Sequence, residues 1–236
     1  MSHSIYLALD FPSWEETKHF LNTNELTGIP VKVGMELFYR EGPAVIEKLR
    51  QNNHPVFLDL KLHDIPTTVM KAMQNIARLD VEMINVHALG GAEMIKRAKE
   101  GLIVGNAGTT KLIAVTMLTS MNKQVMNKEL CIPGEVEDNV THLAEFAQSS
   151  GADGVVCSVH ETKKIKEACT NAFLTVTPGI RLAGTEDHDQ KRIATPGYAR
   201  NQGTDYIVIG RSVTKAQEPK LAYERLVKEW NNGLIK

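Results

Sequence analysis

The stretch PVFLDLKL, residues 55–62, decides how this chain folds. Its residues are apolar except Asp59 and Lys61, which stand two positions apart. Side chains alternate across a β-strand, so the two charged residues share one face and the leucines share the other. The leucine face predicts packing against helices. The charged face is therefore expected to point into the interior of a barrel.

Similar short apolar runs recur along the chain, and each is too short for a helix but suits a strand buried on both faces. They span residues 5–10, 31–35, 55–62, 83–88, 111–118, 154–159, 173–180 and 205–211. The segments between them carry apolar residues at three- and four-residue steps, which predicts amphipathic helices. These helices are expected at 14–21, 42–51, 67–79, 92–99, 136–149, 163–168, 196–202 and 215–230.

Eight strands, each followed by a helix, predict an α/β fold with a single closed (β/α)8 TIM barrel over residues 1–236. The alternative is an open doubly wound sheet, which should carry a GxGxxG motif after its first strand. Here the first run ends in LDFP, residues 9–12, which contains no glycine. No linker rich in proline, glycine or serine divides the chain.

The overall composition limits the partners of the protein. Lys and Arg total 27 against 28 Asp and Glu, a net charge of −1, so no basic excess favours nucleic acid or an anionic membrane. An anionic ligand would need a local site. Three cysteines without a CxxC pair indicate reduced thiols, and no signal peptide or long apolar span is visible. We therefore expect a cytoplasmic protein.

Charged residues recur at the ends of the first three predicted strands, as Asp10, Lys32, Asp59 and Lys61. Carboxyl ends of barrel strands meet at one end of the barrel, where active sites lie. Leaving one member of a buried ion pair unpaired costs roughly 3–5 kcal/mol, so an alternating carboxylate–ammonium array is expected. Such an array can hold a lysine charged as a proton donor. The alternative is a purely structural ion pair inside the barrel.

Asp64 has two interpretations. It precedes the segment IPTT, residues 65–68, and could cap the helix that follows. It could instead serve a site beyond the barrel mouth. Among the histidines, His87 is expected to be a hydrogen-bonded core or supporting residue. No histidine spacing matches HxxxH or HExxH, so no metal site is predicted.

The last two strand ends predict an anion site. TPGIR, residues 177–181, and GRSVT, residues 210–214, stand where barrels commonly bind phosphate through backbone N–H groups and a helix N-terminus. Gly210 permits close backbone approach, and Arg211 supplies a permanently charged donor fork. The alternative is an ordinary turn with a solvated arginine. The long loops 119–133 and 182–190 are either lids over the mouth or surface insertions.

LDLKLHDIP, residues 58–66, resembles the DxKxxDIP signature of the orotidine 5′-phosphate decarboxylase family. LD (9–10), VKVG (31–34), TPGIR (177–181) and VIGR (208–211) follow in the family's order, so the resemblance covers essentially the whole chain and favours the compact bacterial branch. It implies a homodimeric barrel that converts orotidine 5′-monophosphate to uridine 5′-monophosphate and CO2. This is the last step of de novo pyrimidine synthesis, and no cofactor or metal is implied.

The resemblance also implies a role for each matching residue. Lys61 would donate the proton to the pyrimidine carbon that loses CO2, and Asp59 would lie beside the departing carboxylate. Lys32 and Asp10 would bind the ribose and hold the charges in place. The remaining substrate contacts would be Asp64 and Ile65 in the neighbouring subunit's site, Thr119 on the pyrimidine, Gln190 between base and phosphate, and Arg181, Gly210 and Arg211 on the phosphate.

Two other functions remain open at this point. A metal-dependent decarboxylase or aldolase of sugar phosphates shares the DxKxxD motif, but those relatives carry on the second strand a glutamate that helps to bind Mg²⁺. This chain has Lys32 in that region, and a second cation there would repel a metal. A non-catalytic barrel that binds nucleotide phosphate would need Arg181 and Arg211 but not Lys61.

Overall fold

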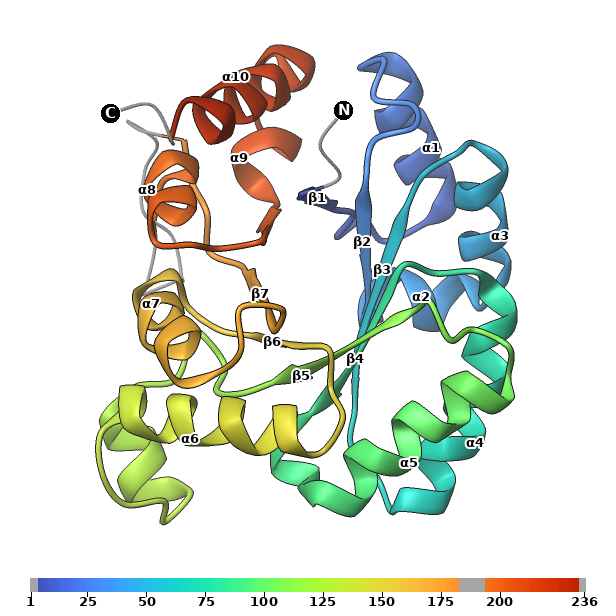
Figure 1. Cartoon of the computed structure of the whole chain (residues 1–236). Helices are drawn as coiled ribbons and strands as arrows, with labels where there is room; N and C mark the ends of the chain where they lie inside the picture. The colour runs from blue at the N-terminus through green and yellow to red at the C-terminus, as the bar shows by residue number, and fades with distance from the viewer. Residues whose placement is uncertain (1–3, 183–193, 234–236) are drawn as a thin grey trace.

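The computed structural model describes residues 4–182 and 194–233, and its eight parallel strands close into a barrel in chain order (Figure 1). The strands are β1 Ile5–Ala8, β2 Val31–Gly34, β3 Val56–Leu62, β4 Met83–His87, β5 Lys111–Val115, β6 Gly154–Val156, β7 Leu174–Thr177 and β8 Tyr206–Ile209. β1 pairs with both β2 and β8, which closes the sheet. The predicted barrel is confirmed, and the open sheet is wrong.

All eight predicted strands exist, but every one except β3 ends earlier than predicted. β1 stops at Ala8 and β5 at Val115, for example. The apolar composition runs on because the residues after the strands are buried as well: Leu9 is fully buried and Met117 nearly so. The apolar pattern alone therefore cannot show where a strand ends.

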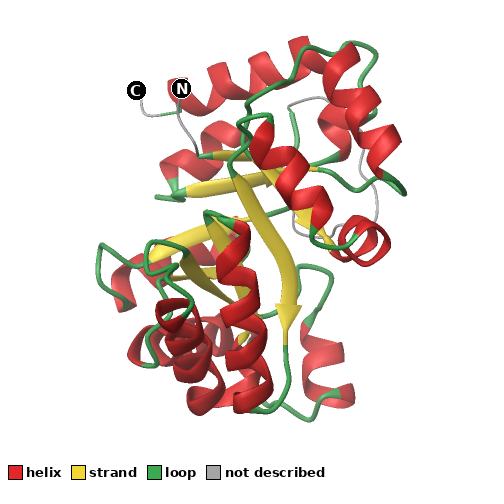
Figure 2. Ribbon diagram, turned by 90° about the vertical axis from the view of Figure 1, so that its right-hand side faces the viewer, coloured by secondary structure: helices red, strands yellow, loops and turns green. Residues whose placement is uncertain are grey.

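The helices form an outer ring around the strands in Figure 1, and Figure 2 shows from the side that the strands lie between them. They are α1 Trp14–Thr23, α2 Met35–Glu41, α3 Ala44–Gln51, α4 Pro66–Ile76, α5 Gly91–Val104, α6 Val136–Ser149, α7 Val159–Ala168, α8 Pro196–Asn201, α9 Arg211–Thr214 and α10 Pro219–Asn232. Short turns of other helix types lie at Ala77–Leu79, Ala88–Gly90 and Val125–Glu129. Across residues 4–182 and 194–233, no helix combines the length and apolar character needed to cross a bilayer.

Three helix predictions are corrected. The expected helix 42–51 is α3 alone, and α2 before it was missed because only Leu37 of that helix is buried. Gly42, at φ 67°, ends α2 and separates the two. The expected helix 215–230 is α10, which begins only at Pro219, and the short α9 before it was not predicted. α7 begins at Val159, earlier than predicted, after a capping box of Ser158 and Glu161.

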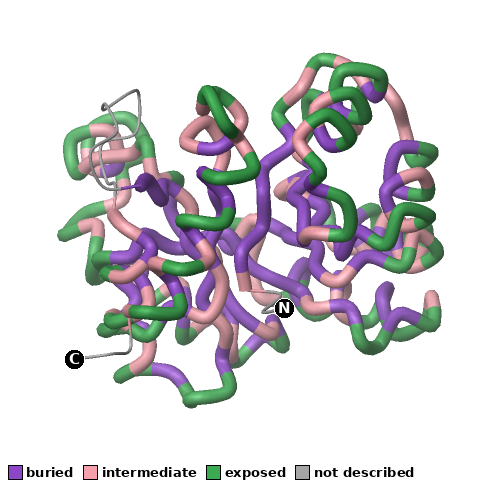
Figure 3. The backbone as a smooth tube through the Cα atoms, turned by 90° about the horizontal axis from the view of Figure 1, so that it is seen from above, coloured by how far each residue is buried: buried purple, intermediate pink, exposed green. Residues whose placement is uncertain are grey.

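The core has two layers. Leu58 and Leu60 belong to the larger layer between strands and helices, as the alternation in β3 predicts. The smaller layer fills the barrel interior with Tyr6, Ala8, Phe57, Met83, Ile113, Val176 and Val208. Figure 3 shows the buried strands surrounded by exposed outer segments. Because these side chains fill the interior, the barrel is closed along its axis and no channel runs through it.

Candidate active site

A cavity of about 560 Å³ opens at the carboxyl end of the barrel. Ala8, Phe57, Val176 and Val208 line it and also belong to the interior layer, so they form its floor. The predicted site residues that line it are Asp10, Lys32, Asp59, Lys61, Thr119, Arg181, Gly210 and Arg211. Gln190 lies outside the described residues. The cavity thus brings together charges from the first three strands and the predicted anion site.

Four of these residues form one alternating row of charges. Lys61 Nζ lies 2.7 Å from Asp59 Oδ1, and Lys32 Nζ lies 3.2 Å from Asp59 Oδ2. Lys32 Nζ also lies 3.5 Å from Asp10 Oδ1. The Lys32 and Asp59 side chains are 11% and 13% exposed, whereas Asp10 is 63% exposed. The row therefore runs from the solvent-facing rim to the interior of the cavity.

The central pair of this row is held in its charged form. Burial alone would lower the pKa of Lys32, but the charges of Asp59 and Asp10 outweigh it and raise that pKa above its ordinary value. Burial alone would raise the pKa of Asp59. The charges of Lys32 and Lys61, with hydrogen bonds from Lys61 and Asn85, lower it instead. Asp59 is therefore a carboxylate, and Lys32 an ammonium, at neutral pH.

β3 does not stay regular at its charged end. Lys61 has a φ of 50°, in the left-handed region, and the pairing with β4 shifts register between Leu58 and Leu62. A left-handed lysine costs of the order of 1–3 kcal/mol unless its surroundings hold it. Alternation therefore predicted the face of Lys61 correctly, but the bend that aims it did not follow from the pattern.

Asn85 on β4 is the one residue of this centre that the sequence analysis missed. It is fully buried. Its Nδ2 donates to Asp59 Oδ1 at 2.6 Å, and its Oδ1 accepts from the Lys61 backbone N–H at 2.7 Å. A signal was present: Asn85 is polar between Ile84 and Val86, and alternation places it on the same inward face as Met83.

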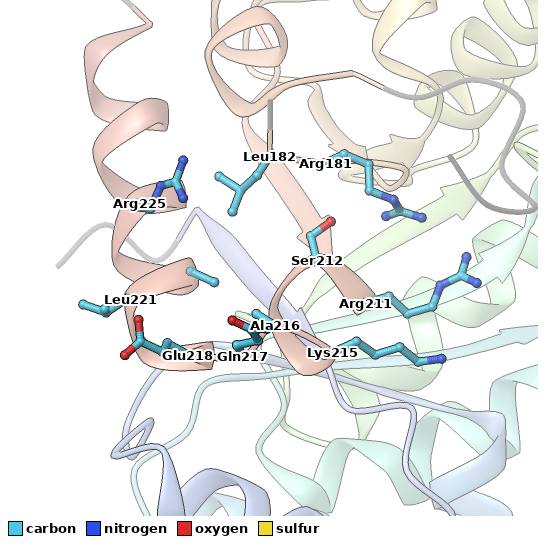
Figure 4. Close-up of a pocket in the computed structure, with 11 residues that line it drawn as sticks. Arg181, Leu182, Arg211, Ser212, Lys215, Ala216, Gln217, Glu218, Leu221 and Arg225 are labelled. Carbon is cyan, nitrogen blue, oxygen red and sulfur yellow. The ribbon is translucent and has the colours of Figure 1, made fainter. Parts of the chain in front are cut away.

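The anion site forms where the chain leaves β7 and β8. Arg181 is 8% exposed and donates to the Ile180 carbonyl at 3.0 Å. A Cβ at Gly210 would lie 3.6 Å from Ala8 Cβ, so glycine keeps this part of the cavity open. Figure 4 shows Arg181, Arg211 and Lys215 extending toward the same side. The predicted helix N-terminus is α9, with only four residues, so charged side chains rather than a helix dipole supply most of the positive potential.

Asp64 and Ile65 lie outside the cavity, on the exposed loop after β3. Asp64 Oδ1 accepts from the Ile65 backbone N–H at 2.6 Å. The residue that caps α4 is Ile65, without a side-chain hydrogen bond, and Pro66 occupies the first turn. The interpretation of Asp64 as the helix cap is therefore wrong. Its carboxylate is hydrogen-bonded to the N–H of the N-cap residue and to no N–H of the first turn of α4, and Ile65 is 68% exposed.

The structure describes the first of the two loops predicted as lids, a single residue of the second, and His87. Loop 119–133 contains a π-helical turn at Val125–Glu129, and Thr119 at its start lines the cavity. Of loop 182–190, only Leu182 is described. His87 Nδ1 accepts from the Leu89 N–H at 3.3 Å and its ring stacks on His63, so it is a hydrogen-bonded supporting residue as expected. In the described part of the chain, no three His, Cys, Asp or Glu side chains gather as metal ligands would.

Comparisons with known proteins point in one direction. The family model described as Orotidine 5'-phosphate decarboxylase / HUMPS family matches residues 3–226. A curated orotidine 5'-phosphate decarboxylase of Bacillus pumilus is 52% identical over 98% of this chain and 100% of the relative. One of Geobacillus thermodenitrificans is 53% identical over 96% of each. A crystal structure of orotidine 5'-phosphate decarboxylase from Lactobacillus acidophilus aligns with a TM-score of 0.85 at 44% identity, covering 96% of this chain and 98% of that one.

Proposed function

The chain belongs to the orotidine 5′-phosphate decarboxylase family, and from that membership we propose how its cavity acts. The enzyme is a carboxy-lyase that converts orotidine 5′-monophosphate to uridine 5′-monophosphate and CO2 in pyrimidine biosynthesis. The observation that carries the proposal for the mechanism is the Asp10–Lys32–Asp59–Lys61 row at the cavity.

Lys61 is the proton donor in this proposal. Loss of CO2 leaves a carbanion in the plane of the pyrimidine ring, which the π-system cannot delocalise. An ammonium fixed beside that carbon stabilises the developing charge and then supplies the proton. Asp59, 2.7 Å from Lys61 Nζ, favours the charged ammonium and holds its direction. The left-handed bend at Lys61 supports the same role, because strained backbone persists where the surroundings over-determine it.

Asp59 lies beside the substrate carboxylate in this proposal. Its lowered pKa keeps it negative, so it opposes the carboxylate in the bound substrate and no longer does so once neutral CO2 has formed. Lys32 and Asp10 bind the ribose hydroxyls. Lys32 contacts the carboxylates of both Asp10 and Asp59, so Asp59 is shared between two ammonium groups and is not paired with Lys61 alone.

The far end of the substrate is held by the cationic end of the cavity. We place the phosphate against Arg181, Arg211 and the open backbone at Gly210, and the pyrimidine against Thr119. Gln190 is proposed to bridge base and phosphate. The phosphate does not react, so its binding energy can be used to order the loops and position the ring.

The active form in this proposal is a homodimer with shared sites. Large apolar side chains are exposed on the loops and helices that follow β2 to β5. They are Met35 (45% exposed), Tyr39 (70%), Ile65 (68%), Leu89 (42%) and Leu118 (39%). A second copy related by a two-fold axis would cover such a face on both subunits. Asp64, unused by its own helix, would then reach the partner's cavity together with Ile65.

The reaction is proposed to need no cofactor or metal, since the Lys32 ammonium occupies the wall where a cation would bind. The test is the loss of orotidine 5′-monophosphate absorbance by purified enzyme, with and without a chelator. Equal rates support the proposal. Activity that disappears with chelator and returns with Mg²⁺ would favour metal-dependent chemistry. Phosphate binding without turnover would favour a non-catalytic barrel.

We place the enzyme in the cytoplasm. Cys131, Cys157 and Cys169 are all free thiols, which suits a reducing compartment.

A further inference from the structure

We propose that Asn85 is a positioning residue for the decarboxylation, because it fixes both members of the Asp59–Lys61 pair. The proposal rests on the function assigned to this cavity. Asn85 does not line the cavity and so cannot contact the substrate itself. It acts on the carboxylate through Nδ2, at 2.6 Å, and on the lysine backbone through Oδ1, at 2.7 Å.

The first bond sets the rotation of the Asp59 carboxylate. Asp59 Oδ1 accepts hydrogen bonds from Lys61 Nζ and Asn85 Nδ2, which leaves Oδ2 to pair with Lys32. Without Asn85, Oδ1 keeps only the flexible lysine chain as a donor. The carboxylate could then rotate, and the distances that place both ammonium groups would no longer be fixed.

The second bond holds the Lys61 bend. The register shift beside β4 removes Lys61 from regular strand pairing, so its N–H needs another acceptor. Asn85 Oδ1 provides it from inside the barrel. A lysine at φ 50° would otherwise relax toward extended backbone, which would change the direction in which its side chain leaves β3 and move Nζ from its place beside Asp59.

Asn85→Leu tests the proposal, because leucine has a similar size but can make neither bond. We expect kcat to fall by roughly 100-fold, the loss typical of misplacing a catalytic group by about 1 Å. KM should stay within a few-fold, since the phosphate ligands are untouched. The affinity for uridine 5′-monophosphate should also persist and reports that the variant is folded.

The pH profile separates positioning from mere stability. Asn85 lowers the pKa of Asp59 together with the facing charges of Lys32 and Lys61, and His87 interacts electrostatically with Lys61. Losing the Asn85 bond raises the Asp59 pKa. The acid limb of kcat/KM should therefore move to higher pH in Asn85→Leu.

Thr110→Val is the matched control. Thr110 is 4% exposed and donates to the Val81 carbonyl at 2.9 Å, at the other end of the barrel. Its loss also removes a buried hydrogen bond, so it should lower the melting temperature and leave kcat and the pH profile unchanged.

If Asn85→Leu does not fold, the variant Asn85→Asp tests the proposal in its place. Its carboxyl still accepts from Lys61 N–H, but the repulsion between two carboxylates so close raises the pKa of one of them strongly. The variant should work while one proton is shared and lose activity as pH rises, unlike the wild type. A kcat of Asn85→Leu within threefold of wild type, or an Asn85→Asp profile like that of wild type, would overturn the proposal. Absence of wild-type turnover would instead overturn the assigned function.

A second inference rests on a different observation: we infer that Lys215 is a further phosphate-binding residue. Lys32 and Lys61 are paired with carboxylates, whereas Lys215 Nζ has no ion pair or hydrogen bond within residues 4–182 and 194–233. Lys215 immediately follows α9 and lines the same cavity as Arg211, four residues before it. Figure 4 shows its ammonium extending on the side of Arg211.

Lys215→Met tests this inference, with Lys228→Met on the exposed surface of α10 as the control for net charge. We expect KM for orotidine 5′-monophosphate to rise about tenfold at constant kcat, as loss of one hydrogen bond to a charged group implies. Inhibition by uridine 5′-monophosphate should weaken by the same factor, and Lys215→Arg should restore both. A KM no higher than that of Lys228→Met, or a fall in kcat alone, would overturn the inference.

Discussion

Replacing Lys32 with methionine removes the central cation of the charged row and keeps the length of the side chain. At 3.2 Å and an effective dielectric constant of about 20, the attraction between Lys32 and Asp59 is about 5 kcal/mol. Part of this attraction is offset, because the variant no longer has to bury an ammonium. Breaking a buried ion pair therefore typically destabilises a protein by roughly 3–5 kcal/mol. Asp59 keeps Lys61 and Asn85, so we expect a loss of about 3 kcal/mol in the free energy of unfolding.

The assay is denaturant unfolding of wild type and Lys32→Met across pH. In wild type, the lowered pKa of Asp59 contributes stability that is present at neutral pH and lost as pH falls through that pKa. In the variant this acid loss should begin at higher pH. The pKa of Lys32 is raised in the folded protein, so its charge stabilises the fold fully at pH values below the ordinary lysine pKa. That stability is lost as pH rises through the raised pKa of Lys32. The variant has no ammonium at this position and should not show this loss at alkaline pH.

Lys164→Met is the control, because Lys164 pairs with Glu137 and Asp138 on the exposed surface. It should leave the unfolding curves unchanged. Lys32→Met as stable as wild type at pH 7, with an unshifted acid limb, would refute the account of Lys32 as the charge that holds Asp59.

Three further results are expected. Mixing Lys61→Ala with Asp64→Ala under subunit exchange should restore roughly a quarter of wild-type activity, because about half the dimers are mixed and each has one intact site; no recovery, with exchange confirmed, would mean that Asp64 does not serve a partner's site. Arg211→Ala should raise KM by about 10- to 100-fold, the loss of a charge-assisted contact to phosphate, and an unchanged KM in steady-state kinetics would remove Arg211 from the phosphate site. Dialysis against EDTA should leave the rate unchanged, and recovery only with added Mg²⁺ would contradict the metal-free mechanism.

The barrel was predictable because its strands and helices differ in period. The apolar alternation in 55–62 also gave the correct faces of Asp59 and Lys61. Strand ends were not predictable in the same way, since Leu9 and Met117 are buried although they lie beyond the ends of β1 and β5. α2 was missed because it buries little, and the early start of α7 was missed although its capping box is visible in the sequence.

The charged row was predictable because each member stands at a strand end, and strand ends of a barrel converge. The bend at Lys61 was not, because it depends on how β3 pairs with β4 and not on the residues of β3 alone. Asn85 was overlooked for a related reason. A single polar residue in a strand carries no motif, and its importance appears only when the fold brings it to Asp59.

The most direct test of the central claim is the decarboxylation of orotidine 5′-monophosphate by Lys61→Ala, followed by absorbance beside wild type. Lys99→Ala is the matched control, because it breaks an equally close ion pair, 2.6 Å from Asp153, at the other end of the barrel. We predict that Lys61→Ala binds uridine 5′-monophosphate but has no detectable turnover, while Lys99→Ala keeps wild-type kcat. Turnover by Lys61→Ala above a few per cent of wild type would contradict the assignment of Lys61 as the proton donor.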